Sequence, residues 1–285
     1  MITAISTKPS WLLRLGLWAV GLGHVTWFLL VRLFESPPPP PPPWYIPGRP
    51  LRVGGTVRCP PPVVMQGVDR EHQVRAGWLA DAAAEYASVA AFGRLGLQLI
   101  ALGAPRALVA AVQHAGLQEI EHSRLCDEMG SPDGAQIPVL RSFPSAVAQM
   151  RPIRLADLAM ESLLDGALNE TFAARVAEVT GQSCEDARAR EVLRLIAQDE
   201  YGHARLAWQI VEWAVSRDSE SVHAALRAGL STIDSAMPPN GAPSGLVRFG
   251  RPDDAVLAAC FEDARADVRT RLVGLLPGGE LSAPT

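Results

Sequence analysis

Residues 119–125, EIEHSRL, and residues 200–206, EYGHARL, spell one pattern twice, Glu-x-x-His-x-Arg-Leu, 81 residues apart. On a helix, residues three positions apart lie on the same face. The glutamate and the histidine of each copy therefore point the same way, and together they can hold one metal ion. The repeat thus predicts two helices that each carry half of a metal-binding set.

Helical periodicity of apolar residues begins near residue 72 and predicts four long helices around the two motifs. The first and second helices are separated by a short stop signal, and so are the third and fourth, which makes each pair an antiparallel hairpin. A long connection, residues 130–153, joins the two hairpins. This is the connectivity of a ferritin-like four-helix bundle, so we expect an all-α fold. The predicted helices span residues 73–102, 106–129, 154–179 and 186–216, with two further helices near residues 219–232 and 253–275.

A pair of ions also needs bridging carboxylates, which we expect from the first and third helices, one glutamate each. Glu85 lies on an apolar stripe of the first helix, where a carboxylate is costly unless it is paired or bound to metal. On the third helix, Glu170 lies on a face of small apolar residues. Glu161 lies on the opposite face with Asp157 and Asp165, a face that looks partly solvated, so we select Glu170.

The predicted ligand set thus contains four carboxylates and two imidazoles, the composition of a carboxylate-bridged site for two metal ions. Iron suits this mixture of oxygen and nitrogen ligands, and manganese is the alternative. The members are Glu85, Glu119, His122, Glu170, Glu200 and His203.

Single copies of Glu-x-x-His carry little information, because the chain contains a third. Glu220 and His223 lie in a polar setting without partner glutamates, so we interpret them as a solvated surface pair. Arg124 and Arg205 follow the motif histidines by two residues, which places them on the outer face of each helix. Cys126, one turn beyond the first motif histidine, is interpreted as a packed core thiol.

Four segments, EYASVAAFGRLGLQLIALGAP, EIEHSRL, LLDGALNETFAA and IAQDEYGHARLAW, resemble the ferritin-like domain proteins of myxobacteria and related bacteria. The resemblance covers about residues 74–216 and extends to the wider superfamily of ferritin and rubrerythrin. It implies a di-iron carboxylate site at the six positions named above. One departure is Asp165, where the family leads us to expect glutamate, and that position lies off the proposed site.

The composition argues against several classes of function. The chain has 285 residues, a formal net charge of −4 and no long basic run, which argues against a nucleic-acid partner. None of its four cysteines forms a C-x-x-C pair, so a rubredoxin-like site is not expected. No flavin or nicotinamide motif occurs, so an electron donor would be a separate partner. A homo-oligomer is compatible with all of these features.

The N-terminal part differs from the rest. Residues 15–31 carry no formal charge and predict a single membrane anchor within residues 11–34, although their length is at the low end for a span. The alternatives are a signal segment and an over-long gene start. If the N-terminal segment is not used, the protein would be cytoplasmic. Seven prolines, residues 37–43, follow as a polyproline II rod.

The expected organisation is therefore an anchor or signal, a Pro-rich linker that wraps irregularly, a di-metal bundle and a helical extension, at residues 1–35, 36–70, 71–217 and 218–285. The favoured function is redox chemistry on dioxygen or peroxide, as an oxidase, oxygenase or peroxidase. The alternatives are iron handling, by oxidation, storage or buffering, and a metal-stabilised interaction module without catalysis. The sequence leaves open whether the protein is an enzyme.

Overall fold

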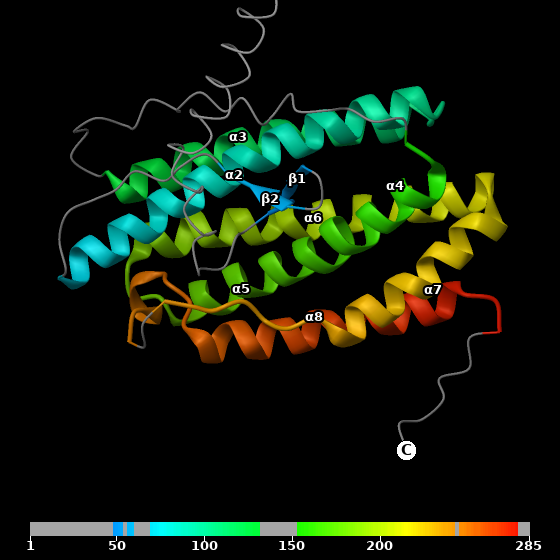
Figure 1. Cartoon of the computed structure of the whole chain (residues 1–285). Coiled ribbons are helices and arrows are strands. Elements are labelled where there is room, and N and C mark those ends of the chain that lie inside the picture. The colour runs from blue at the N-terminus through cyan, green and yellow to red at the C-terminus, as the bar shows by residue number, and fades with distance from the viewer. Residues whose placement is uncertain (1–47, 54–55, 60–68, 132–152, 243–244, 279–285) are drawn as a thin grey trace, which may run out of the picture. The chain divides into compact units, whose positions relative to one another are not determined.

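The structure is a computed structural model that describes residues 48–53, 56–59, 69–131, 153–242 and 245–278 (Figure 1). The chain divides into two units, residues 1–42 and 43–285, and all described residues belong to the second. The predicted anchor, the proline run and most of the long connection lie outside the described residues. Among the described helices, none is long and apolar enough to cross a membrane.

The described part is mainly helical, which confirms the all-α prediction. Its strands and helices follow one another as β1 Leu51–Val53, β2 Thr56–Arg58, α2 Arg70–Ala101, α3 Arg106–Gly130, α4 Leu155–Glu161, α5 Asn169–Ser183, α6 Ala187–Arg217, α7 Ser219–Ser235 and α8 Asp254–Leu275. A π-helical turn, η2 (Ser162–Leu168), joins α4 and α5 into one continuous helical run, and a 3-10 turn, η3 (Val247–Phe249), precedes α8. Each predicted helix is present, with ends within about four residues of the expected positions.

The helix starts follow from local sequence. Asp69, Asp186, Asp218 and Asp253 each precede a helix and accept a hydrogen bond from a backbone N–H of its first turn. Such a cap satisfies one of the N–H groups that a helix start leaves without a partner. At the other end of α2, Gly103 adopts a φ of 71°, which allows the tight turn into α3.

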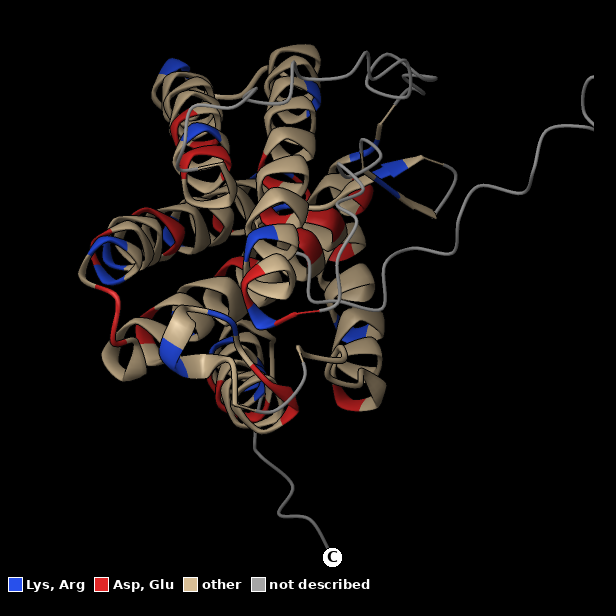
Figure 2. Cartoon of the chain, turned by 90° about the vertical axis from the view of Figure 1, so that its left-hand side faces the viewer, with Lys and Arg blue, Asp and Glu red and all other residues tan. Residues whose placement is uncertain are grey.

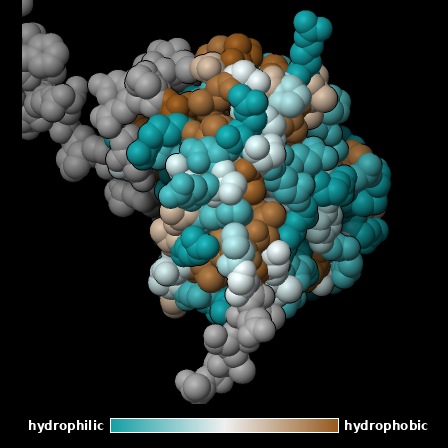
Figure 3. Space-filling model, turned by 90° about the vertical axis from the view of Figure 1, so that its right-hand side faces the viewer, coloured by the Kyte–Doolittle hydropathy of each residue, from teal (hydrophilic) through white to brown (hydrophobic). Residues whose placement is uncertain are grey.

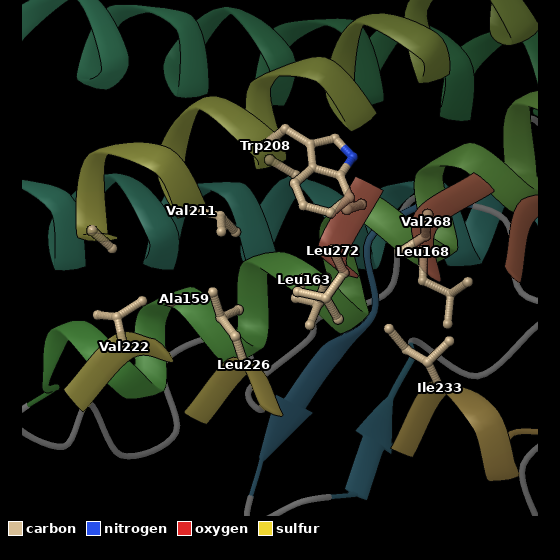
Figure 4. Close-up of a cluster of buried hydrophobic side chains, with 13 residues drawn as sticks. Ala159, Leu163, Leu168, Trp208, Val211, Val222, Leu226, Ile233, Val268 and Leu272 are labelled. Atoms are coloured by element: carbon tan, nitrogen blue, oxygen red, sulfur yellow. The ribbon is translucent and has the colours of Figure 1, made fainter. Parts of the chain in front are cut away.

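The long helices pack as two hairpins. α2 lies along α3, α5 lies along α6, and α3 also packs on α6, which brings the hairpins together (Figure 1). α7 and α8 cover α4 and α5 from outside, and their apolar side chains meet Trp208 and Leu163 in a buried cluster (Figure 4). This packing leaves the middle of the four long segments as the interior.

The surface mixes polar and apolar side chains. The end of the molecule at the α6–α7 turn is mostly hydrophilic, with hydrophobic patches in the upper part of that view (Figure 3). On α2 and α3, the large exposed apolar side chains are Leu97, Ile100, Leu117 and Ile120.

The region expected to wrap irregularly contains a β-hairpin instead. β1 and β2 pair antiparallel, with Leu51 opposite Arg58. The sequence-based interpretation missed the hairpin because its strands are only three residues long and lie among prolines and glycines. β1 packs against α2, so this part of the chain belongs to the folded unit.

Candidate metal centre

All six predicted ligand residues lie in the interior, on four different helices. Glu85 comes from α2 and Glu170 from the first turn of α5, while the two Glu-x-x-His motifs lie in α3 and α6. None of the six exposes more than 3% of its surface. Figure 2, which looks along the long helices, shows acidic segments among the helices as well as on their outer sides.

The two motif glutamates lie between the two histidines. His122 Nδ1 is 3.4 Å from Glu119 Oε2 and 3.4 Å from Glu200 Oε1. His203 Nδ1 is 3.3 Å from Glu119 Oε1 and 3.6 Å from Glu200 Oε2. Each of these two shared carboxylates therefore turns one oxygen toward each histidine.

The side chains form two groups that could each hold one ion. One group joins Glu85 and His122 to the shared carboxylates, and the other joins Glu170 and His203 to them. Within each group, one ligand atom from every residue lies within 4.8 Å of the others. Both groups are buried, and both take their donors from three helices.

Their arrangement differs from the expected one in a single respect. We expected Glu85 and Glu170 to be the bridging residues, but it is Glu119 and Glu200 that belong to both groups. The reason is the packing of α3 directly on α6, which makes the two motif glutamates face each other. Glu85 comes from α2 and Glu170 from α5, and each belongs to one group only.

A second set of polar contacts fixes the histidine rings. His122 Nε2 lies 3.1 Å from Asp199 Oδ2, and His203 Nε2 lies 3.1 Å from Gln118 Oε1. Gln118 Nε2 also donates to Asp199 Oδ1 at 2.6 Å, which links the two contacts. With both Nε2 atoms engaged, each ring presents Nδ1 to the carboxylates, as second partners do for metal-binding histidines.

Sequence reasoning missed Gln118 and Asp199, although a signal was present. Each residue directly precedes a motif glutamate, so the fuller repeat is Gln/Asp-Glu-x-x-His. Each one contacts the histidine of the other helix. That crossed pairing follows only from the facing of α3 and α6, which a single sequence does not give.

Several buried ligand atoms have no hydrogen-bond partner, which tests whether metal ions fit. Buried polar atoms are nearly always satisfied, and an isolated unsatisfied one costs about 1–3 kcal/mol. Nine of the buried atoms without a partner belong to these six residues, and all nine are electron-pair donors. They are Glu85 Oε2, both carboxylate oxygens of Glu119, Glu170 and Glu200, and Nδ1 of His122 and His203. A donor set of this kind fits cations.

Electrostatics in the protein without metal lead to the same conclusion. Burial, and then the charge of Glu119, raises the pKa of Glu85 well above its usual value. Burial and the neighbouring Glu200 do the same to the pKa of Glu170. Burial alone would lower the pKa of His203, but its contacts with the shared carboxylates raise it to about 9. Without metal, protons thus take the place of the missing positive charge.

The segment 48–53 crosses the site beside Glu85 and was not predicted to take part. Gly48 has a φ of 73°, and a Cβ there would lie 3.0 Å from Glu85 Oε2 and 2.6 Å from Ser88 Oγ. Ser88 Oγ donates to the Arg49 carbonyl at 2.9 Å. The close approach explains why a glycine stands at this position.

A small cavity of about 30 Å³ adjoins Glu85. Its lining is largely apolar and includes the buried thiol of Cys126 and the Thr180 hydroxyl, which has no hydrogen-bond partner. An ion pair between Arg251 and Asp81 lies beside the cavity. The cavity has enough room for a water molecule.

Other sequence-based interpretations are confirmed. Arg124 lies on the outer face, where it pairs with Glu121 at 2.6 Å, and Arg205 is exposed. For the expected surface pair, Glu220 is exposed and His223 is half-buried, and neither belongs to a metal-binding group. Cys126 is a buried free thiol.

Asp165 requires a correction. We expected its face to be partly solvated, but the π-helical turn buries it, and Arg52 Nε donates to Asp165 Oδ1 at 2.8 Å. The expectation assumed regular helix geometry, from which a π-helical turn departs. The residue still lies outside the two metal-binding groups.

Comparison of the chain with protein-family models, with curated proteins and with solved structures finds no match.

Proposed function

We propose that this chain is a di-iron carboxylate protein with a ferritin-like four-helix bundle, and that it performs redox chemistry on dioxygen or peroxide. One observation carries the proposal. Two buried groups of donors share Glu119 and Glu200, and their ligand atoms have no other hydrogen-bond partners. Protonated histidines reach the shared carboxylates only at 3.3–3.6 Å, whereas two divalent ions would bind these atoms directly.

The proposal of a ferritin-like four-helix bundle rests on the order of the helices and of their ligand residues. Each hairpin supplies a glutamate from its first helix and a Glu-x-x-His pair from its second, the pattern of di-iron carboxylate bundles. Four carboxylates offset the charge of two divalent ions. The mixed oxygen and nitrogen donors suit iron, with manganese as the alternative.

When bound, two ferrous ions would supply electrons to dioxygen or peroxide side by side. The protein's own residues do the remaining work. Asp199 and Gln118 hold the imidazoles so that both Nδ1 atoms face the shared carboxylates. The cavity beside Glu85 is small, about 30 Å³, which favours a small substrate over a bulky one.

The proposal is tested by loading the purified full chain with ferrous iron without oxygen, and then admitting dioxygen or hydrogen peroxide. We expect about two irons per chain and turnover when an external reductant is added. Many irons per chain in a large assembly would support storage instead. Two bound irons that react with neither oxidant would leave only a metal-stabilised module.

A further inference from the structure

The N-terminal segment 48–53 spans the seam between the two helical hairpins at the metal centre. On one side, Ser88 of α2 binds the Arg49 carbonyl, and Arg94 of α2 donates to the Arg52 carbonyl. On the other side, the Arg52 side chain binds Asp165 of the π-helical turn at 2.8 Å and 3.0 Å. The segment that carries Arg49 is therefore held from both sides, at Arg49 by α2 and at Arg52 by α2 and the π-helical turn.

The guanidinium of Arg49 is buried, with 4% of the residue exposed. A Cβ on Gly166 would lie 2.8 Å from Arg49 Nη1, so the group lies against the π-helical turn. Its Cζ lies 5.8 Å from the ring centroid of Phe92, and that ring stacks edge-on against His203 at 5.1 Å. Arg49 is thus on the His203 side of the metal centre.

Within the described part of the chain, the Arg49 guanidinium has neither a hydrogen bond nor an ion pair within 4.0 Å. The carboxylates that attract it from a longer distance are those of Asp165, Glu170 and Glu161. Asp165 is already paired with Arg52. Glu161 lies at the partly exposed edge of the turn, where water weakens its pull.

Glu170 supplies little counter-charge to Arg49, with or without metal. Without metal, burial and the charge of Glu200 raise the pKa of Glu170 and disfavour its ionised form. Burial lowers the pKa of Arg49, yet an arginine keeps its proton in proteins. Once Glu170 serves as a ligand, its negative charge is offset by the ion that it binds. Arg49 is therefore a buried cation without a bonded anion, and that state is costly.

We propose that Arg49 creates an anion-binding position at the Glu170–His203 half of the metal centre, for small monoanions such as azide, formate or hydroperoxide. This inference rests on the proposed function, because the anion binds between the guanidinium and the ion at that half. The Arg49 side chain thus favours anionic over neutral ligands at this position. An anion there gains a charge-assisted hydrogen bond from a donor that is already fixed in place.

The test uses the full chain loaded with Co(II), and azide as the anionic probe, followed by visible absorption. Imidazole, largely uncharged at about pH 8, is the neutral probe. We expect Arg49→Gln to lower azide affinity roughly 10- to 100-fold, with imidazole affinity and Co(II) content unchanged. Arg49→Lys keeps the positive charge and should recover most of the lost affinity.

Two further variants separate charge from structure. Arg94→Gln removes a contact that holds the same segment but leaves Arg49 in place, so azide affinity should stay close to wild type. Arg52→Gln frees Asp165 to neutralise Arg49, and it should weaken azide even though Arg49 is intact. It therefore tests the idea even if Arg49→Gln fails to fold.

The outcomes distinguish the two proposals. Failure of wild-type protein to bind Co(II) would overturn the proposed function itself. Normal Co(II) binding with equal azide affinity in wild type, Arg49→Gln and Arg52→Gln would overturn only the role of Arg49. A parallel loss of azide and imidazole binding would make Arg49 a structural residue and would likewise overturn the inference.

Discussion

Replacing Glu170 by glutamine should stabilise the protein without metal and destabilise it with metal. Glu170 shares a group with Glu119, Glu200 and His203, whose ligand atoms lie within 4.8 Å of one another. Without ions, burial and the charge of Glu200 raise its pKa, so folding requires that the carboxyl either take up a proton or stay charged at a cost. Glutamine keeps the shape of the side chain and removes that requirement.

The magnitude follows from the geometry. Two unit charges 4.8 Å apart repel by about 3.5 kcal/mol at an effective dielectric constant near 20. Protonation already relieves part of this repulsion, so we expect a gain of about 1 to 3 kcal/mol in the metal-free variant. That gain corresponds to roughly 2 to 12 °C in melting temperature for a folded unit of this size.

Bound metal should make the wild type more stable than the Glu170→Gln variant. An ion present at about 1,000 times its dissociation constant stabilises the folded wild type by about 4 kcal/mol, and the variant loses much of that contribution at its altered position. The assay is thermal unfolding of both proteins with chelator and with Co(II). Glu178→Gln is the same change at an exposed position of α5, where the amide oxygen can still accept the Tyr201 hydroxyl hydrogen bond, so it should shift stability by less than about 0.5 kcal/mol. A Glu170→Gln variant that is less stable without metal, or that gains as much from metal as wild type, would refute the reasoning.

Three other predictions test separate parts of the site. Asp199→Asn should weaken binding at the His122 position by about 10- to 100-fold in calorimetric titration, because the ring loses its carboxylate partner, whereas Glu191→Gln on the exposed side of α6 should not. Stability of the metal-free protein, measured by urea unfolding, should fall by at least about 3 kcal/mol as pH rises from 6.5 to about 9. Folded His203 holds its proton with a pKa of about 9 and the unfolded chain does not, and the raised pKa of His122 adds to the fall. A flat profile would contradict this assignment. Gly166→Ala should cost about 1–3 kcal/mol, because its Cβ would lie 2.6 Å from that of Ala207, while Gly93→Ala, with open space around it, should be neutral or stabilising by up to about 1 kcal/mol in the same unfolding assay.

The helices and the ligand residues were predictable for a common physical reason. Periodicity places Glu119 with His122 on one face, and it shows that Glu85 and Glu170 lie on apolar faces where a bare carboxylate is costly. The structure brings these residues together in the interior, as the sequence predicts. Local sequence patterns therefore suffice to predict which side chains point inward.

The remaining features depend on which elements face each other. Glu200 belongs to both groups only because α3 packs on α6, and Asp199 reaches His122 across that same contact. Arg49 lies in a Pro- and Gly-rich stretch without hydrophobic periodicity, so its burial could not be predicted. The burial of Asp165 depends on a π-helical turn, which periodicity at 3.6 residues per turn does not anticipate.

The most direct measurement is anomalous diffraction at the iron edge from crystals of the iron-loaded full chain. The account predicts two peaks about 3.5–4 Å apart, both between Glu119 and Glu200, with Glu85 nearest to one and Glu170 nearest to the other. A single peak, no peak among these residues, or iron bound only at surface groups such as Glu220 and His223 would contradict it.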